Sequence, residues 1–138
     1  MRQGRIVELV DLLSPEAERA GARVTRETAQ QIPATQDLHG LVVDIQHDEV
    51  KWCGMLMKVI RSLQATPTDV TGAFHGKAMA IEDMTERLVF LNRGQAWVVR
   101  RLQALIPRVQ DAAIQAELQT MLDAHIGNIE RVERRLQA

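Results

Sequence analysis

The sequence contains few of the residues on which several classes of protein depend. Only four of its 138 residues are aromatic, namely Trp52, Phe74, Phe90 and Trp97, and tyrosine is absent. Since single-stranded nucleic acids are usually held by stacked aromatic rings, this scarcity argues against such a partner. Cys53 is the only cysteine, which excludes an intramolecular disulfide and a zinc site made of several thiolates.

Charge and hydrophobic runs exclude further classes of protein. The net charge is −1, so no overall field favours nucleic acid or an anionic membrane surface. The longest apolar runs are far shorter than the roughly 20 residues of a membrane span, and Glu8 and Asp11 interrupt the segment that a signal peptide would need. Apolar residues make up 46% of the chain and charged residues 25%, as in an ordinary globular domain. We therefore expect a cytoplasmic protein that forms a single domain over residues 1–138, without a nucleic-acid or membrane partner.

Apolar residues recur at helical spacing in four long segments, and no segment alternates as a strand would. Within the first segment, Ser14 and Pro15 match an N-cap followed by proline at the first helical position, so this segment is either two helices or one kinked helix. The third segment starts between Asp69 and Met79 and ends before Pro107. The other segments cover residues 4–31, 37–64 and 110–136.

Four helices of about 25 residues, each apolar on one side, bury those sides best against one another. Ile45, Leu56, Leu102 and Leu118 lie on the expected buried faces. The sequence therefore predicts an all-α four-helix bundle. A third helix that begins near residue 69 gives an up-down-up-down topology, whereas an extended stretch over 67–79 spans the roughly 40 Å of a long crossover at about 3.3 Å per residue. Both topologies stay open.

Parts of three helices resemble the ferritin-like superfamily, and in particular an uncharacterised bacterial ferritin-like domain family. The stretches are EAERAG (16–21), HDEVKWCGML (47–56), GKAMAIED (76–83) and FLNRGQAW (90–97). The resemblance extends over nearly the whole chain and implies the ferritin-like fold. Di-iron members of that superfamily use Glu-x-x-His on two helices. Here Trp52 follows Glu49 where histidine would be needed, and Leu122 precedes His125 where glutamate would be needed. A reduced or degenerate metal site is therefore expected in place of a standard one.

Counting about 100° per residue places a few polar side chains on the buried faces. His125 lies at the centre of this face on the fourth helix, and Asp48 and Glu49 flank it on the second. Glu16 lies on the inward side of the first helix. All are near the middle of their helices and can share one layer. Imidazole and carboxylate ligands suit iron, manganese or zinc, with iron or manganese expected here, so the sequence predicts a metal site of Glu16, Glu49 and His125, with Glu82 as a fourth candidate ligand.

Two other interpretations compete with a metal site. A hydrogen-bonded pair of His125 and a carboxylate could only fix the register of the helices, which would make the protein a non-enzymatic structural or interaction module. A bundle with Met55, Met84 and Met121 inside could also bind an apolar small molecule, because methionine adapts its shape to ligands. Mutation of His125 separates the first interpretation from the metal site.

Two further patterns concern the third helix and the glycines. The residues expected to face inward on the third helix are Lys77, Asn92 and Gln95 rather than an acid, which weighs against a metal. Every helix also contains an interior glycine, and each costs about 1 kcal/mol relative to alanine. Most of them are expected to lie off the buried face, where they would allow close approach of a second subunit, so we expect a homodimer. These glycines are Gly21, Gly54, Gly94 and Gly127.

Overall fold

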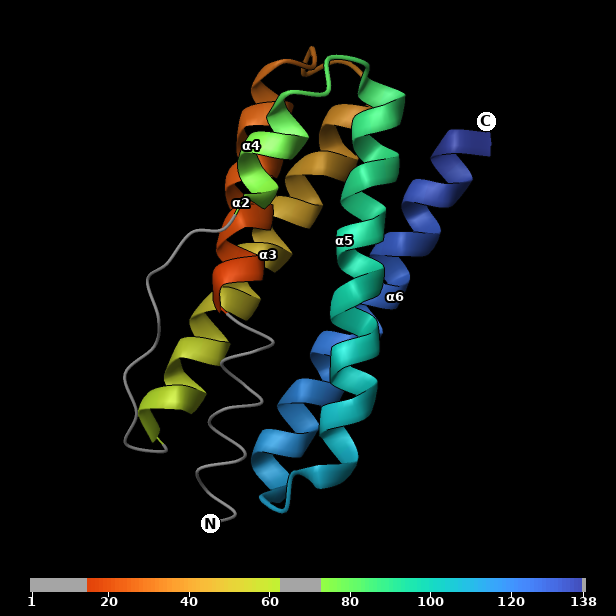
Figure 1. The fold of residues 1–138 in the computed structure, drawn as a ribbon. Coiled ribbons are helices and arrows are strands. Elements are labelled where there is room, and N and C mark those ends of the chain that lie inside the picture. The colour runs from red at the N-terminus through yellow and green to blue at the C-terminus, as the bar shows by residue number, and fades with distance from the viewer. Residues whose placement is uncertain (1–14, 63–72, 138) are drawn as a thin grey trace.

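The computed structural model describes residues 15–62 and 73–137, with side chains over 19–61 and 73–137. These residues form helices joined by short turns, and no strand occurs in the described ranges. The prediction of an all-α bundle is confirmed (Figure 1). The elements are α2 (Pro15–Gln30), α3 (Asp37–Ser62), α4 (Phe74–Met79), α5 (Met84–Leu105), the 3-10 helix η1 (Ile106–Arg108) and α6 (Ala112–Gln137).

Most helix boundaries lie close to those predicted from the sequence. α2 begins at Pro15, as expected for a residue whose fixed φ angle and missing N–H suit the first turn. The rest of the first predicted segment, residues 4–14, lies outside the described residues. α6 follows Asp111, whose Oδ1 accepts hydrogen bonds from the N–H groups of Ala113 (2.9 Å) and Ile114 (3.0 Å). A side chain that accepts the free N–H groups of a first turn fixes where the helix starts.

The prediction of one continuous third helix was wrong. The chain forms the short α4, leaves the helical conformation over residues 80–83, and then starts α5 at Met84. Asp83 has an extended backbone (φ −69°, ψ 123°), and its Oδ1 accepts a hydrogen bond from the N–H of Glu86 at 2.9 Å. Because an N-cap residue ends the preceding conformation as well as starting the new one, Asp83 separates the two helices.

The helix directions settle the topology that the sequence left open. One buried apolar cluster unites the N-terminal half of α3 (Val42, Ile45) with the N-terminal half of α5 (Leu88, Leu91). A second cluster unites the C-terminal halves of the same helices with the beginning of α6. α3 and α5 therefore run in the same direction, as Figure 1 shows. This is the long-crossover arrangement. None of the helices described here combines the length and the apolar character needed to cross a membrane.

The short helix α4 packs against both α2 and α5. The ring of Phe74 stacks on that of Phe90 in α5, with centroids 5.1 Å apart. A Cβ atom added to Gly94 would lie 2.9 Å from the Phe74 ring, so the absence of a side chain at Gly94 makes room for it. On the other side, Nε2 of His75 lies 2.7 Å from Oε2 of Glu27 in α2. These contacts hold α4 in place through one aromatic and one polar pair.

Replacement of Glu27 by glutamine is expected to lower stability at neutral pH and to have little effect in acid. The hydrogen bond with His75 lowers the pKa of Glu27 below its ordinary value of 4.5, with a smaller contribution from Arg23. A carboxyl group whose pKa is lowered by folding stabilises the protein above its unfolded pKa, and this stability is lost as the pH falls through the folded value. Since the pair is partly exposed, we expect a difference of at most about 1 kcal/mol at neutral pH.

Urea unfolding of wild type and Glu27→Gln at pH 7 and at a pH below the folded pKa of Glu27 measures this difference. The two proteins should differ at pH 7 and converge in acid, because a protonated glutamate and a glutamine have nearly the same shape and charge. A difference of equal size at both pH values would contradict the role of the ionised Glu27 carboxylate.

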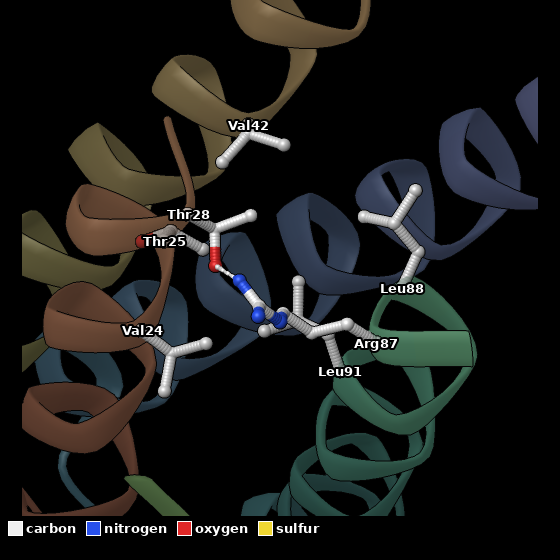
Figure 2. Close-up of a pocket in the computed structure, with 7 residues that line it drawn as sticks. All are labelled: Val24, Thr25, Thr28, Val42, Arg87, Leu88 and Leu91. Carbon is white, nitrogen blue, oxygen red and sulfur yellow. Dashed lines mark hydrogen bonds between the residues drawn. The ribbon is translucent and has the colours of Figure 1, made fainter. Parts of the chain in front are cut away.

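Arg87 joins α5 to the C-terminal end of α2 through a buried guanidinium group (Figure 2). Its Nε donates to the carbonyl of Ile81 at 2.9 Å, and its Nη1 donates to Oγ1 of Thr28 at 3.2 Å and to Oε1 of Gln31 at 2.8 Å. A cation is favoured at this place because the last turn of a helix bears the negative end of its dipole. The surrounding space, which Val24, Leu88 and other side chains line, is too small for a water molecule. Arg87 therefore stabilises the packing of α5 against α2 and does not belong to a ligand site.

Candidate metal centre

A layer of buried polar side chains lies between the two apolar clusters, near the middle of the bundle. Each of its members is at least 94% buried, and they come from α3, α5 and α6. Polar groups buried away from water cost free energy unless they form hydrogen bonds or bind an ion. The arrangement of these side chains therefore decides whether the layer only joins helices or can also hold a metal ion. The members are Glu49, Gln95, His125 and Asn128.

The imidazole of His125 is oriented by its own helix. Its Nδ1 lies 2.9 Å from the carbonyl oxygen of Met121. Because a carbonyl oxygen only accepts hydrogen bonds, Nδ1 bears the hydrogen, and in the neutral ring Nε2 is then the nitrogen whose lone pair acts as acceptor or metal ligand. Metal-binding histidines are commonly fixed in this way, with one nitrogen bonded to a backbone carbonyl and the other directed at the ion.

The Nε2 atom of His125 lies 3.9 Å from Oε1 of Glu49 in α3. This distance exceeds the roughly 2.7–3.2 Å of a direct hydrogen bond. Two atoms that each bind one ion at about 2.0–2.2 Å can lie up to about 4.4 Å apart. The separation of the two atoms therefore fits an ion held between them, and both side chains are shielded from solvent.

Glu49 is held against α2 at Gly21. A Cβ atom at Gly21 would lie 2.8 Å from Oε2 of Glu49 and 2.9 Å from its Cδ, so any side chain here would displace the carboxylate. Gly21 and Gly94 are thus explained by contacts within the chain rather than by a second subunit. At Gly54 and Gly127 an added Cβ would meet no atom within 4 Å. The expected homodimer stays a prediction.

α5 contributes an amide to the layer. Asn92 donates to the carbonyl of Ile129 in α6 at 3.2 Å, and Nε2 of Gln95 donates to Oδ1 of Asn92 at 3.1 Å. α5 and α6 are antiparallel (Figure 1), so Gln95, one turn beyond Asn92 on α5, and His125, one turn before Ile129 on α6, lie on the same side of the Asn92–Ile129 contact. Oε1 of Gln95 is buried and has no hydrogen-bond partner. A buried acceptor in this state costs about 1–3 kcal/mol, which a cation or a water molecule in the layer would offset.

The four predicted ligands have different positions. The structure brings Glu49 and His125 together in this layer. Glu82 is exposed in the turn before α5, about three helical turns from the layer, and does not join it. Glu16 lies in the first turn of α2, and its side chain is outside the described part. Lys77, expected to face inward, is exposed, so that prediction was wrong.

Two inward-facing amides were predicted from the sequence and are confirmed. Gln95 is buried and Asn92 is half-buried, and both point toward α6 or the layer. Asn128 was missed, although it follows His125 by one turn on the same face. Nδ2 of Asn128 donates to Oδ2 of Asp48 in α3 at 2.9 Å. The spacing of Asn128 from His125 could have revealed it.

The described residues do not fit a di-iron site of the four-carboxylate, two-histidine kind. The motif Glu-x-x-His occurs nowhere in the sequence. Trp52 stands three residues after Glu49, where the motif has histidine, and Leu122 stands three residues before His125, where the motif has glutamate. Both Trp52 and Leu122 are buried. Among the described side chains Glu49 is the only buried acid, and no group of three acidic, histidine or cysteine side chains surrounds one point. One carboxylate, one imidazole and one amide oxygen do suit a single ion.

Comparisons with known proteins agree with this architecture. Residues 5–134 match the family described as "Domain of unknown function (DUF6306)". The structure is similar to the crystal structure of a ferritin-like, diiron-carboxylate protein from Bacillus anthracis strain Ames, with a TM-score of 0.85 and 16% sequence identity. The similarity covers 99% of this chain and 98% of that one. No curated protein matches the sequence. At this identity the likeness establishes the fold alone, which is ferritin-like.

Proposed function

The chain belongs to the DUF6306 family, and we propose that it is a ferritin-like protein with a reduced metal site that holds one metal ion in the middle of the bundle. The ligands are Oε1 of Glu49 and Nε2 of His125, which lie 3.9 Å apart. This distance, together with the hydrogen bond that directs Nε2 at the carboxylate, is the observation that supports the proposal most. Oε1 of Gln95 is a third ligand, and Glu16 stays in the set as a prediction.

Oxygen and nitrogen ligands of this kind favour iron or manganese. The structural neighbour from Bacillus anthracis is described as a diiron-carboxylate protein, which supports a metal and gives iron some preference. A bound iron or manganese ion would supply one-electron redox chemistry. The chain itself orients the ligands and excludes water from the site. The backbone carbonyl of Met121 fixes the orientation of the His125 ring, and the buried side chains of Trp52 and Leu122 occupy the positions where a second ion would need ligands.

A titration of the metal-free protein with Mn(II), followed by electron paramagnetic resonance, tests this proposal. The six-line signal of free Mn(II) should be suppressed until one equivalent has been added and grow linearly afterwards. Addition of a chelator should restore the signal. A signal that grows linearly from the first addition would show that the layer does not bind the ion.

A second candidate is the structural module, which the other hydrogen bonds in the layer favour. Asn128 bonds to Asp48 across α6 and α3, and Asn92 bonds to the backbone of α6. Such bonds are lost if a helix slides by one turn, so they specify the register of the bundle without any metal. The two candidates differ in one respect: only a metal site makes the melting temperature depend on added Mn(II) or on a chelator.

A further inference from the structure

Hydrogen bonds join α6 to the N-terminal half of α3. Arg131 donates to Asp44 at 3.0 Å, and Asn128 donates to Asp48 at 2.9 Å. Further toward the C-terminal end of α3 the same two helices border a groove with a volume of about 330 Å³. Sites for small molecules usually range from about 300 to 1,000 Å³, so the groove has room for a small ligand.

Gly54 gives the groove its depth on the side of α3. It is exposed, and a Cβ atom added there would meet no atom within 4 Å. A glycine inside a helix is destabilising relative to alanine, and no close contact within the chain explains this one. The missing side chain leaves open the space beside the half-buried Met55, which supplies apolar surface to the groove, while the buried Trp52 lies at its floor.

Charges of opposite sign line the two walls of the groove. Lys51 and Lys58, two turns apart on α3, form one wall, and Glu117 of α6 lies on the other. The Nζ atom of Lys51 is 4.6 Å from the centre of the Trp52 ring, where the electron-rich face attracts a cation. The ion pairs of the described side chains do not include one between Lys58 and Glu117. Both charges are therefore free to meet a ligand.

We propose that this groove binds a small zwitterion with an apolar body, of the chemical class of an aromatic amino acid. Its carboxylate pairs with Lys51 and Lys58, its ammonium group pairs with Glu117, and its apolar part lies on Met55 in the space beside Gly54. An exposed ion pair strengthens binding by at most about fivefold, so selectivity requires both charged ends together with the apolar contact. The proposal does not depend on the metal site.

Titration with L-phenylalanine, followed by NMR chemical shifts of the full chain, tests the proposal. Two reference compounds each lack one charge: 3-phenylpropionate has no ammonium group and phenethylamine has no carboxylate. L-Phenylalanine should bind at least about twofold to fivefold more tightly than either compound, because it alone meets both walls. Equal affinity for L-phenylalanine and 3-phenylpropionate would show a simple anion site and overturn the proposal, as would no saturable binding up to about 10 mM.

Substitutions locate the binding. Gly54→Leu fills the groove without a clash in the chain and should weaken L-phenylalanine binding on the order of tenfold. Gly40→Leu is the matched control, because Gly40 is an exposed glycine of the same helix that also has open space around it. Glu117→Gln should weaken binding of L-phenylalanine and leave 3-phenylpropionate unaffected. If Gly54→Leu binds as Gly40→Leu does, the ligand does not occupy this groove.

Discussion

A His125→Ala variant is expected to bind the metal ion on the order of a hundredfold more weakly than the wild type and to lose it during dialysis. Loss of a partner that merely orients a ligand already weakens metal binding about 10–100-fold, and His125 is proposed as a direct ligand. The substitution removes the only imidazole in the described polar layer and leaves Glu49 facing a small cavity. Elemental analysis of both proteins, prepared in parallel with added iron or manganese, measures the effect.

Two controls make this result specific. His47→Ala removes an exposed histidine of α3 and should leave the metal content unchanged. Circular dichroism must show that His125→Ala remains helical, since the loss of a polar neighbour of a buried carboxylate costs about 1–3 kcal/mol in stability. A folded His125→Ala protein with the wild-type metal content would place the ion elsewhere and remove the basis of the proposed site.

Arg87→Met should lower the free energy of unfolding by about 2–3 kcal/mol. Methionine keeps most of the apolar stem but removes three hydrogen bonds from a charged donor, and such bonds are worth more than neutral ones. Removal of a buried cation also relieves a desolvation cost, which partly offsets the loss. We expect the hydrogen bonds to dominate because Thr28 is buried and its neighbours leave no room for a water molecule to replace the guanidinium group. Urea unfolding at pH 7 measures the difference.

Arg93→Met provides the matched control, since Arg93 is an exposed arginine on the same helix and its replacement should change stability by less than about 0.5 kcal/mol. Arg87→Lys separates charge from geometry. Lysine keeps the positive charge but lacks the planar guanidinium group that bonds to Ile81, Thr28 and Gln31 together. Arg87→Lys should therefore lower the free energy of unfolding about as much as Arg87→Met. An Arg87→Met protein as stable as the wild type would contradict a structural role for this residue.

The sequence predicted the bundle because the apolar pattern of each helix is one-sided. Ile45, Leu56, Leu102 and Leu118 lie on the predicted stripes, and all four are fully buried. The apolar periodicity was less informative where packing and helix capping decide where a helix begins or ends. The division between α4 and α5 depends on Asp83, whose role as an N-cap could not be distinguished from that of a surface acid inside one long helix.

The candidate site was only partly accessible to sequence reasoning. The positions of Glu49 and His125 on their stripes suggested that the two residues share a layer, which the structure shows. The role of Arg87 could not be foreseen, because its acceptors belong to a distant helix and to a turn. Gly21 was interpreted as a contact to a second subunit, whereas it accommodates the carboxylate of Glu49.

The contact at Gly21 also bears on the remaining ligand. Gly21 marks the side of α2 that meets Glu49. At about 100° per residue, position 18 lies about 60° around the helix from Gly21, and position 16 lies about 140° away. Position 18 is also a glutamate. Position 18 therefore lies nearer than position 16 to the side of α2 that meets Glu49, which the sequence could not show without a partner for this helix.

The most direct test of a single-ion site is the number of metal ions that each chain binds. Anaerobic titration of the metal-free protein with Fe(II), followed by removal of free iron and elemental analysis, gives this number. The proposed site predicts one ion per chain. Two ions per chain would contradict it and require ligands for a di-iron centre that the described residues do not supply, whereas no bound ion would leave the polar layer as a device that fixes helix register.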